Sequence, residues 1–186
     1  MTTAVKLSEL INGNSGQIVV PSGGINFGTA TDGTGTVSTN GGILDDYEEG
    51  SWTPTWVVAT GSITAYSPHT SGFYRKIGDV VYIWGYIGYS SKSGVSNSDI
   101  LQVGGLPFQS ISSGFGQFSN QAGGVHMFAE TLWSSNSPQG GRIPNNSSTI
   151  SLTHSRGSQS FTHVTVASLD TGANHSQAVF YGQYLT

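Results

Sequence analysis

Cysteine is absent from this chain of 186 residues. Its absence excludes disulfide bonds, thiolate nucleophiles and zinc sites built on cysteine. A chain of this length folds as one sizeable domain with an extension, and it has no covalent cross-link to hold that domain together. The sequence therefore predicts that packing or association between subunits supplies the stability.

Charge is also scarce. Six Lys and Arg side chains stand against ten Asp and Glu, which gives a formal net charge of −4. So few cations cannot neutralise many phosphates, so we expect no nucleic-acid binding. No apolar run approaches the ~18 residues of a membrane span, and residues 1–6 lack a secretory signal. We therefore expect no membrane span, and synthesis and assembly in a cytoplasm.

Glycine and aromatic residues are plentiful, with 27 Gly, 8 Tyr, 8 Phe and 4 Trp. So many aromatic residues argue against a disordered chain. Short apolar runs recur at roughly regular spacing, separated by Gly, Ser and Asn, which is typical of antiparallel strands. We predict an all-β fold, an antiparallel β-sandwich that is jelly-roll-like.

The composition changes at Leu44. Residues 1–43 are rich in Gly, Thr and Asn, whereas aromatic and β-branched runs follow. We predict an extended N-terminal arm over residues 1–43 and a sandwich domain over residues 44–186. Such an arm cannot bury enough surface to order alone, so it is a flexible linker or it orders against neighbouring subunits. Its spaced apolar residues favour contacts with a partner, through Ile18, Val19, Ile25 and Phe27.

For two strands the sequence also predicts how the side chains are distributed between the two faces of the sheet. Val80 to Tyr89 is almost wholly apolar or aromatic, which predicts a central strand covered on both faces, with Trp84 in the core. Gln177 to Leu185 alternates, with Val179, Tyr181 and Leu185 on one face and Phe180 and Tyr184 on the other. Further strands are expected at Gly114–Phe118, Gly124–Trp133, Ser148–Thr153 and His163–Leu169, and outward loops at Ser90–Asn97 and Ser134–Asn146.

Four acidic residues lie within five positions. A cluster this dense resists burial, so we expect it at the surface or against a partner. It lacks the spacing of a calcium-binding loop, although a metal there stays an alternative, and adjacent carboxyl groups do not form a glycosidase pair. The four residues are Asp45, Asp46, Glu48 and Glu49.

Catalytic motifs are missing as well. The sequence has no Gly-x-Ser-x-Gly elbow, and its five histidines are scattered without a His-Glu-x-x-His run. One histidine on a trimer axis stays open as a metal ligand. We therefore predict a protein that is not an enzyme, with no catalytic residue, no cofactor and no metal site.

The aromatic residues exceed what a core of this size must bury. Exposed rings flanked by Asn, Gln and Ser stack on sugars or pack on proteins. Tyr89 and Trp133 follow strands and adjoin polar loops, so they are the predicted glycan contacts. The whole set is Trp56, Tyr66, Phe73, Tyr74, Trp84, Tyr86, Tyr89 and Trp133.

Several segments together resemble a β-sandwich module of tailed-bacteriophage virion proteins. They are Leu44–Trp56 (LDDYEEGSWTPTW), Gly72–Ile83 (GFYRKIGDVVYI), Gly105–Phe108 (GLPF) and the closing Tyr181–Tyr184 (YGQY). The resemblance covers about residues 43–186. It implies a virion protein, usually trimeric, that either decorates the capsid or forms the distal end of a tail fibre or tailspike.

Between these two places we favour the capsid. An arm of about 43 residues spans at most ~3.3–3.6 Å per residue, which is short for a fibre shaft but suits a flat lattice. The expectation is a homotrimeric capsid decoration (cement) protein, bound to the major capsid protein on the outer surface of the virion and assembled in the cytoplasm of the host bacterium. The alternative is a tail-fibre or tailspike domain that binds a carbohydrate receptor on the host.

Overall fold

The computed structural model describes residues 25–26, 43–44, 47–112, 120–130, 133–155, 161–170 and 176–186. The chain divides into two compact units, residues 1–47 and 48–186. In the first unit, β1 (Ile25–Asn26) pairs antiparallel with β2 (Ile43–Leu44). The rest of the predicted arm, with Ile18, Val19 and Phe27, lies outside the described residues. The arm therefore stays a prediction.

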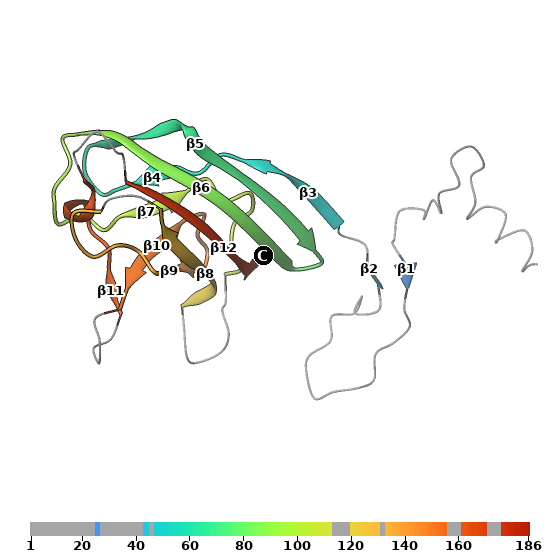
Figure 1. The fold of residues 1–186 in the computed structure, drawn as a ribbon. Coiled ribbons are helices and arrows are strands. Elements are labelled where there is room, and N and C mark those ends of the chain that lie inside the picture. Colours follow the sequence, from blue (N-terminus) through green and yellow to red (C-terminus); the bar gives the residue numbers. More distant parts are fainter. Residues whose placement is uncertain are drawn as a thin grey trace, which may run out of the picture. The chain divides into compact units, whose positions relative to one another are not determined.

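The second unit is built almost wholly of β-strands (Figure 1). Among the described residues, the short 3-10 helix η2 (Val166–Ser168) lies between strands. The strands are β3 (Tyr47–Trp52), β4 (Thr55–Val57), β5 (Ser62–Ile77), β6 (Val80–Ser93), β7 (Gln102–Gly104), β8 (Gln121–Ala129), β9 (Gly140–Pro144), β10 (Ile150–His154), β11 (Thr162–His163) and β12 (Gln177–Leu185).

These ten strands form one hydrogen-bonded sheet. Its order is β3-β5-β6-β12-β8-β9-β10-β7-β4, and β11 pairs with β10 beside this path. The pairings between these strands are antiparallel. The predicted all-β antiparallel class is therefore confirmed, whereas its sandwich and jelly-roll details stay predictions.

The two halves of the sheet share one core. Ile83 on β6 and Phe180 on β12 belong to the same buried cluster as Val103 on β7 and Leu152 on β10. The Trp56 indole of β4 donates a hydrogen bond to the Gly88 carbonyl of β6, at 2.9 Å. Strands that are distant in the sheet order therefore meet across the core.

A long hairpin of β5 and β6 dominates the unit and runs beside β12 (Figure 1). Its turn is Gly78-Asp79, where Gly78 has a φ of 56° that favours glycine. The register shifts between Ala65 and Thr70, around Pro68, which has no N–H to give to a ladder. The hairpin is thus regular between the turn and Thr70, and this regular part positions the candidate site.

Most strand predictions hold, with corrections. β12 spans the predicted Gln177–Leu185, and its two faces divide as predicted; the structure adds that Phe180 and Tyr184 are buried and Tyr181 is exposed. β6 is central, but Tyr82 and Trp84 are exposed, so the prediction of a strand covered on both faces, with Trp84 in the core, is wrong. The reason is that apolar side chains point to both faces of β6, and the rest of the described unit packs on one of them.

Other boundaries also differ from the prediction. β9 lies inside the predicted Ser134–Asn146 loop, and β6 continues to Ser93 into the predicted Ser90–Asn97 loop. The predicted His163–Leu169 strand is instead the end of β11 followed by η2. The predicted Gly114–Phe118 strand lies wholly outside the described residues. Within the part of the chain that the structure describes, no helix is long and apolar enough to cross a membrane.

Candidate binding face

One row of aromatic rings crosses four adjacent strands of the sheet. The register places Phe73 of β5 opposite Trp84 of β6, Trp84 opposite Tyr181 of β12, and Tyr181 opposite His126 of β8. Residues directly opposite each other in a sheet point to the same face. The four rings therefore lie side by side on one face, although up to 108 positions of sequence separate them.

The neighbouring row shows why these rings point outward. Gly72, Gly85, Phe180 and Met127 are paired in the same way, one residue along, and they are buried. Phe180 fills the space over Gly85, since a Cβ on Gly85 would meet its ring at 2.2 Å. Because side chains alternate along a strand, burial of this row forces the aromatic row to the outside.

The outer rings are large and open to solvent. Phe73 is 63% exposed, Trp84 is 46% exposed and Tyr181 is 47% exposed. Phe128, two residues beyond His126 on β8, is 53% exposed. Scattered single apolar residues are ordinary on a surface, but a contiguous apolar patch marks an interaction site. We name this surface the aromatic face.

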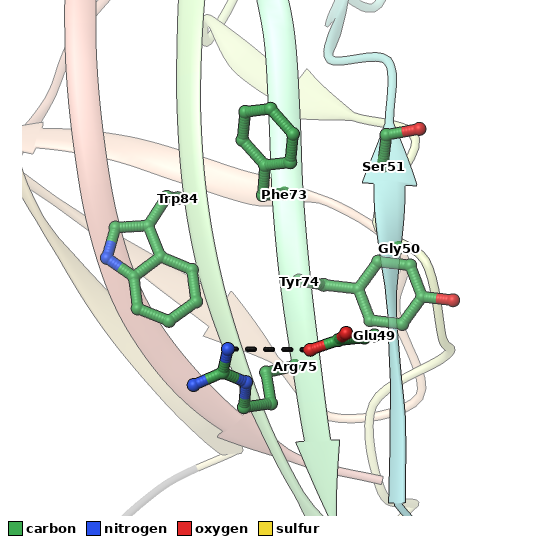
Figure 2. Close-up of a pocket in the computed structure, with 7 residues that line it drawn as sticks. All are labelled: Glu49, Gly50, Ser51, Phe73, Tyr74, Arg75 and Trp84. Atoms are coloured by element: carbon green, nitrogen blue, oxygen red, sulfur yellow. Dashed lines mark hydrogen bonds and ion pairs between the residues drawn. The ribbon is translucent and has the colours of Figure 1, made fainter. Parts of the chain in front are cut away.

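At the Phe73–Trp84 end of the row, the surface over β3, β5 and β6 forms a groove of about 620 Å³. Figure 2 shows Phe73, Arg75 and Trp84 at its wall and Glu49 of β3 reaching toward Arg75. The Arg75 guanidinium lies 3.4 Å from the Glu49 carboxylate. The lining residues are Glu49, Gly50, Ser51, Phe73, Tyr74, Arg75 and Trp84.

Buried contacts hold the groove in shape. The Trp52 indole of β3 donates to the Phe73 carbonyl at 3.3 Å, and it occupies the space over Gly72. Gly50 makes room for the Tyr74 ring, because a Cβ there would come within 2.8 Å of it. Aromatic rings behind β3 and β5 thus fix the strands that carry Phe73 and Glu49.

The ion pair in the groove is exposed on both sides. The Arg75 and Glu49 side chains are 51% and 60% exposed, and such a pair in water contributes little to stability. Its groups are therefore better placed to bind a ligand than to hold the fold. A guanidinium donates several hydrogen bonds and a carboxylate accepts several.

The other end of the row, over β12 and β8, is different in character. The His126 ring lies 4.6 Å from Phe128 and 5.6 Å from Tyr181, and the planes of His126 and Tyr181 are nearly parallel. Beside these rings a hollow of about 280 Å³ is bounded by the outward side chains of Tyr82, Trp84, Tyr181 and Gln183 and by Gly124. This end is an apolar ridge next to a hollow.

Tyr86 lies on the same face of β6 as Trp84, two residues farther along the strand. Burial raises the pKa of its phenol, and the charge of Glu130 raises it further. The hydroxyl donates to the Gln177 side chain, and the ring stacks on His69 at 4.9 Å. These contacts tie Tyr86 into its surroundings, so it borders the exposed surface rather than forming part of it.

Of the predicted partner contacts, the structure describes the side chains of Glu48 and Glu49. Glu48 and Glu49 lie exposed on β3, while Asp45 and Asp46 fall outside the described residues. Nothing is described of the side chain of Ile25. The partner contacts predicted for these residues stay predictions. Across the described ranges, no group of three His, Asp or Glu side chains is arranged to hold a metal ion.

The predicted glycan contacts need correction. Tyr89 is 4% exposed and belongs to the core, so its ring offers no surface to a sugar. Trp133 is half-buried: its indole donates to the Gln177 carbonyl at 3.1 Å and packs edge-on against Trp56. A glycan contact through Trp133 stays a prediction. A position at the end of a strand does not say whether a ring points inward or outward.

Sequence reasoning missed the aromatic face as a unit. Phe73 and Trp84 were among the surplus aromatic residues, and the alternation in Gln177–Leu185 already placed Tyr181 opposite to Phe180. Phe128 was not singled out. What the sequence does not carry is the register that aligns these positions.

Comparisons with known proteins give one finding about the fold. No protein-family model matches the chain, and no curated protein matches it significantly. Among solved structures, the crystal structure of the Dettilon tailspike protein (gp208) is similar, with a TM-score of 0.55 and 20% identity. The match covers 74% of this chain but 23% of the tailspike chain. At this identity the likeness shows the fold alone.

Proposed function

We propose that this chain is a structural protein of a tailed-phage virion, and that residues 48–186 form a tailspike or tail-fibre module that binds carbohydrate on the host surface. The observation that carries the proposal is the groove in which exposed Phe73 and Trp84 rings adjoin the Arg75–Glu49 pair. The fold likeness to a tailspike protein and the phage-like segments around Leu44–Pro54 support the virion part.

The chemistry of the groove suits a sugar ring. A pyranose has an apolar face of C–H groups, which packs on an aromatic ring, and a rim of hydroxyls, which form hydrogen bonds. Phe73 and Trp84 offer the rings, while Arg75 donates to hydroxyl oxygens and Glu49 accepts from hydroxyl protons. The groove volume of about 620 Å³ is within the usual range for small-molecule sites.

The proposal is binding without turnover. Hydrolysis of a glycosidic bond ordinarily uses two carboxyl groups on opposite sides of that bond. Among the described residues that line the groove, Glu49 is the one carboxylate, and it is paired with Arg75. We therefore assign Glu49 to hydrogen bonding with the ligand.

The test is a screen of the full chain on an array of bacterial surface polysaccharides, followed by titration of the best ligand. We expect Phe73→Ala and Trp84→Ala each to weaken binding at least tenfold, and Arg75→Ala to weaken it by a smaller factor. Phe161→Ala is the matched control, since Phe161 is also exposed but lies outside the groove. Binding that survives both groove variants would refute the site, and release of reducing sugar would refute the absence of turnover.

Capsid decoration, which the sequence analysis placed first, becomes the second candidate. The segments around Leu44–Pro54 support both places equally, whereas the fold likeness is to a tailspike protein. In either place we expect a homotrimer, and on a capsid the partner would be the major capsid protein. Quantitative mass spectrometry of purified virions separates the two: a copy number near that of the capsid protein means decoration, and a few copies per particle mean the tail.

A further inference from the structure

We infer that the ridge and hollow on β12 and β8 form an interface for a second copy of this chain. The surface consists of the rings of His126, Phe128 and Tyr181 and the hollow beside Gly124. Trp84 borders both the groove and the hollow, but the ridge rings of His126, Phe128 and Tyr181 lie outside the groove, so the inference is argued from them and does not rest on carbohydrate binding. It also gives the predicted trimer a specific place on the fold.

The strand stretches that form this surface are uncharged. Residues 82–86, 124–128 and 179–183 contain no Asp, Glu, Lys or Arg. Phe128 and Tyr181 are stacked with centroids 6.4 Å apart, and both are about half exposed. With their planes at 28° to each other, the two rings form one adjoining apolar surface. A broad partner surface fits this arrangement better than a sugar does.

The exposed area is what the centre of a protein interface needs. An aromatic side chain presents roughly 150–250 Å². Tyr82, Phe128 and Tyr181 are 37%, 53% and 47% exposed, so together they leave roughly 200–350 Å² uncovered. A stable interface buries ~800 Å² on each partner, around an apolar centre with a polar rim. These rings would supply about a third of that area.

The shape of the surface favours a copy of itself. Phe128 lies four residues beyond Gly124, where the missing side chain contributes to the hollow. At ~3.4 Å per residue, Phe128 and Gly124 are roughly 14 Å apart along β8. In a copy turned against the first, Phe128 of one chain enters the hollow of the other. A reciprocal contact of this kind closes a dimer, and a head-to-tail contact that closes after three copies gives a trimer.

Charge also favours a second copy. A strongly charged partner would find no side chain of opposite charge in residues 82–86, 124–128 and 179–183. Two copies bring together neutral faces, and a net charge of −4 per chain produces little repulsion at physiological salt.

The first test is the solution mass of the full chain, measured by sedimentation between 1 and 100 µM (roughly the range that separates standard interfaces from weak ones). We expect the parent chain to be an oligomer. The folded double variant Phe128→Ser, Tyr181→Ser should have a dissociation constant at least tenfold higher than that of the parent. Phe161→Ser is the matched control and should associate like the parent. A parent chain that stays monomeric throughout would overturn the inference and leave the face to another occupant.

The second test uses the absence of cysteine and does not depend on the double variant folding. In the variant Gly124→Cys, Phe128→Cys, the two thiols of one chain are too far apart for a disulfide, so oxidation cross-links only different chains. A Cβ at Gly124 meets its nearest neighbour, the Gly141 carbonyl oxygen, at 3.2 Å, so a small side chain fits after a slight shift. We expect disulfides that join position 124 of one copy to position 128 of another; oligomers without that cross-link would show that another face holds them.

Discussion

The orientation of the aromatic row is tested most sharply by two phenylalanines that differ mainly in the face they occupy. Phe180 is fully buried, whereas Phe73 is 63% exposed, and both lie in the middle of paired strands. The same substitution, Phe→Ala, should therefore have very different effects on the free energy of unfolding.

For Phe180→Ala we expect a loss of about 3–5 kcal/mol, as for other buried Phe residues. The Phe180 ring fills the space over Gly85 and packs edge-on against Trp52 at 5.9 Å, so its removal leaves a cavity at the centre of the core. For Phe73→Ala, the 37% of the side chain that is hidden amounts to roughly 75 Å² of about 200 Å², which at ~25 cal/mol per Å² is at most about 2 kcal/mol. That value is an upper bound, because an unfolded chain also hides part of the ring.

The assay is urea unfolding at a low, fixed protein concentration, with thermal unfolding as a second readout. At ~3–4 °C per kcal/mol for a unit of this size, Phe180→Ala should lower Tm by roughly 10–20 °C and Phe73→Ala by roughly 7 °C or less. Equal losses for the two variants would refute the assignment of faces, and with it the aromatic row. The same Phe73→Ala protein, still folded, then serves in the carbohydrate titration.

Two further variants test hydrogen bonds outside the aromatic face. The Tyr184 hydroxyl donates to the Phe108 carbonyl at 3.0 Å and accepts from the Phe108 N–H at 3.2 Å. Burial raises the pKa of this hydroxyl, so it stays protonated. Tyr184→Phe should therefore lower the free energy of unfolding by about 1–2 kcal/mol, and an unchanged urea midpoint would contradict this. The Thr60 hydroxyl donates to the Asp99 carboxylate at 2.5 Å, and this bond, with backbone N–H groups of Thr60 and Ser96, holds the Asp99 pKa below its ordinary value. A lowered carboxyl pKa stabilises the fold above the unfolded-state pKa and loses that effect as pH falls through the folded-state pKa. Thr60→Val should therefore raise the Asp99 pKa, and an NMR titration that finds the two proteins alike would show that the hydroxyl is not the cause.

The closing strand shows how much local pattern decides. The bounds of Gln177–Leu185 and the division of its side chains between two faces were predicted correctly, whereas the choice of the buried face was left open. Side chains alternate along any strand, so the division follows from the sequence, but Phe180 and Tyr181 are both aromatic and do not show which face is covered. The all-β class followed from the same kind of local signal, repeated along the chain.

The short strand β9 shows where local pattern fails. Gly140-Gly141-Arg142-Ile143-Pro144 reads as a loop, because glycine and proline ordinarily interrupt strands. In the structure it pairs with both β8 and β10, and a Cβ on Gly141 would meet Ile150 at 2.4 Å and Val125 at 2.9 Å. Gly141 therefore allows Ile150 and Val125 to pack closely on β9. These two residues are distant from each other in sequence, and only the tertiary structure brings them together.

The candidate site depended on the same kind of information. The sequence determined that β6 is an apolar central strand, but it could not determine that one face of β6 is open, because Ile83 and Trp84 are both apolar and alternate in the same way. Nor could it align Phe73, Trp84, Tyr181 and His126, since the register between strands is set by packing across the whole sheet. Composition thus set the supply of aromatic rings, and the pairing of β5, β6, β12 and β8 decided which of them meet on one exposed face.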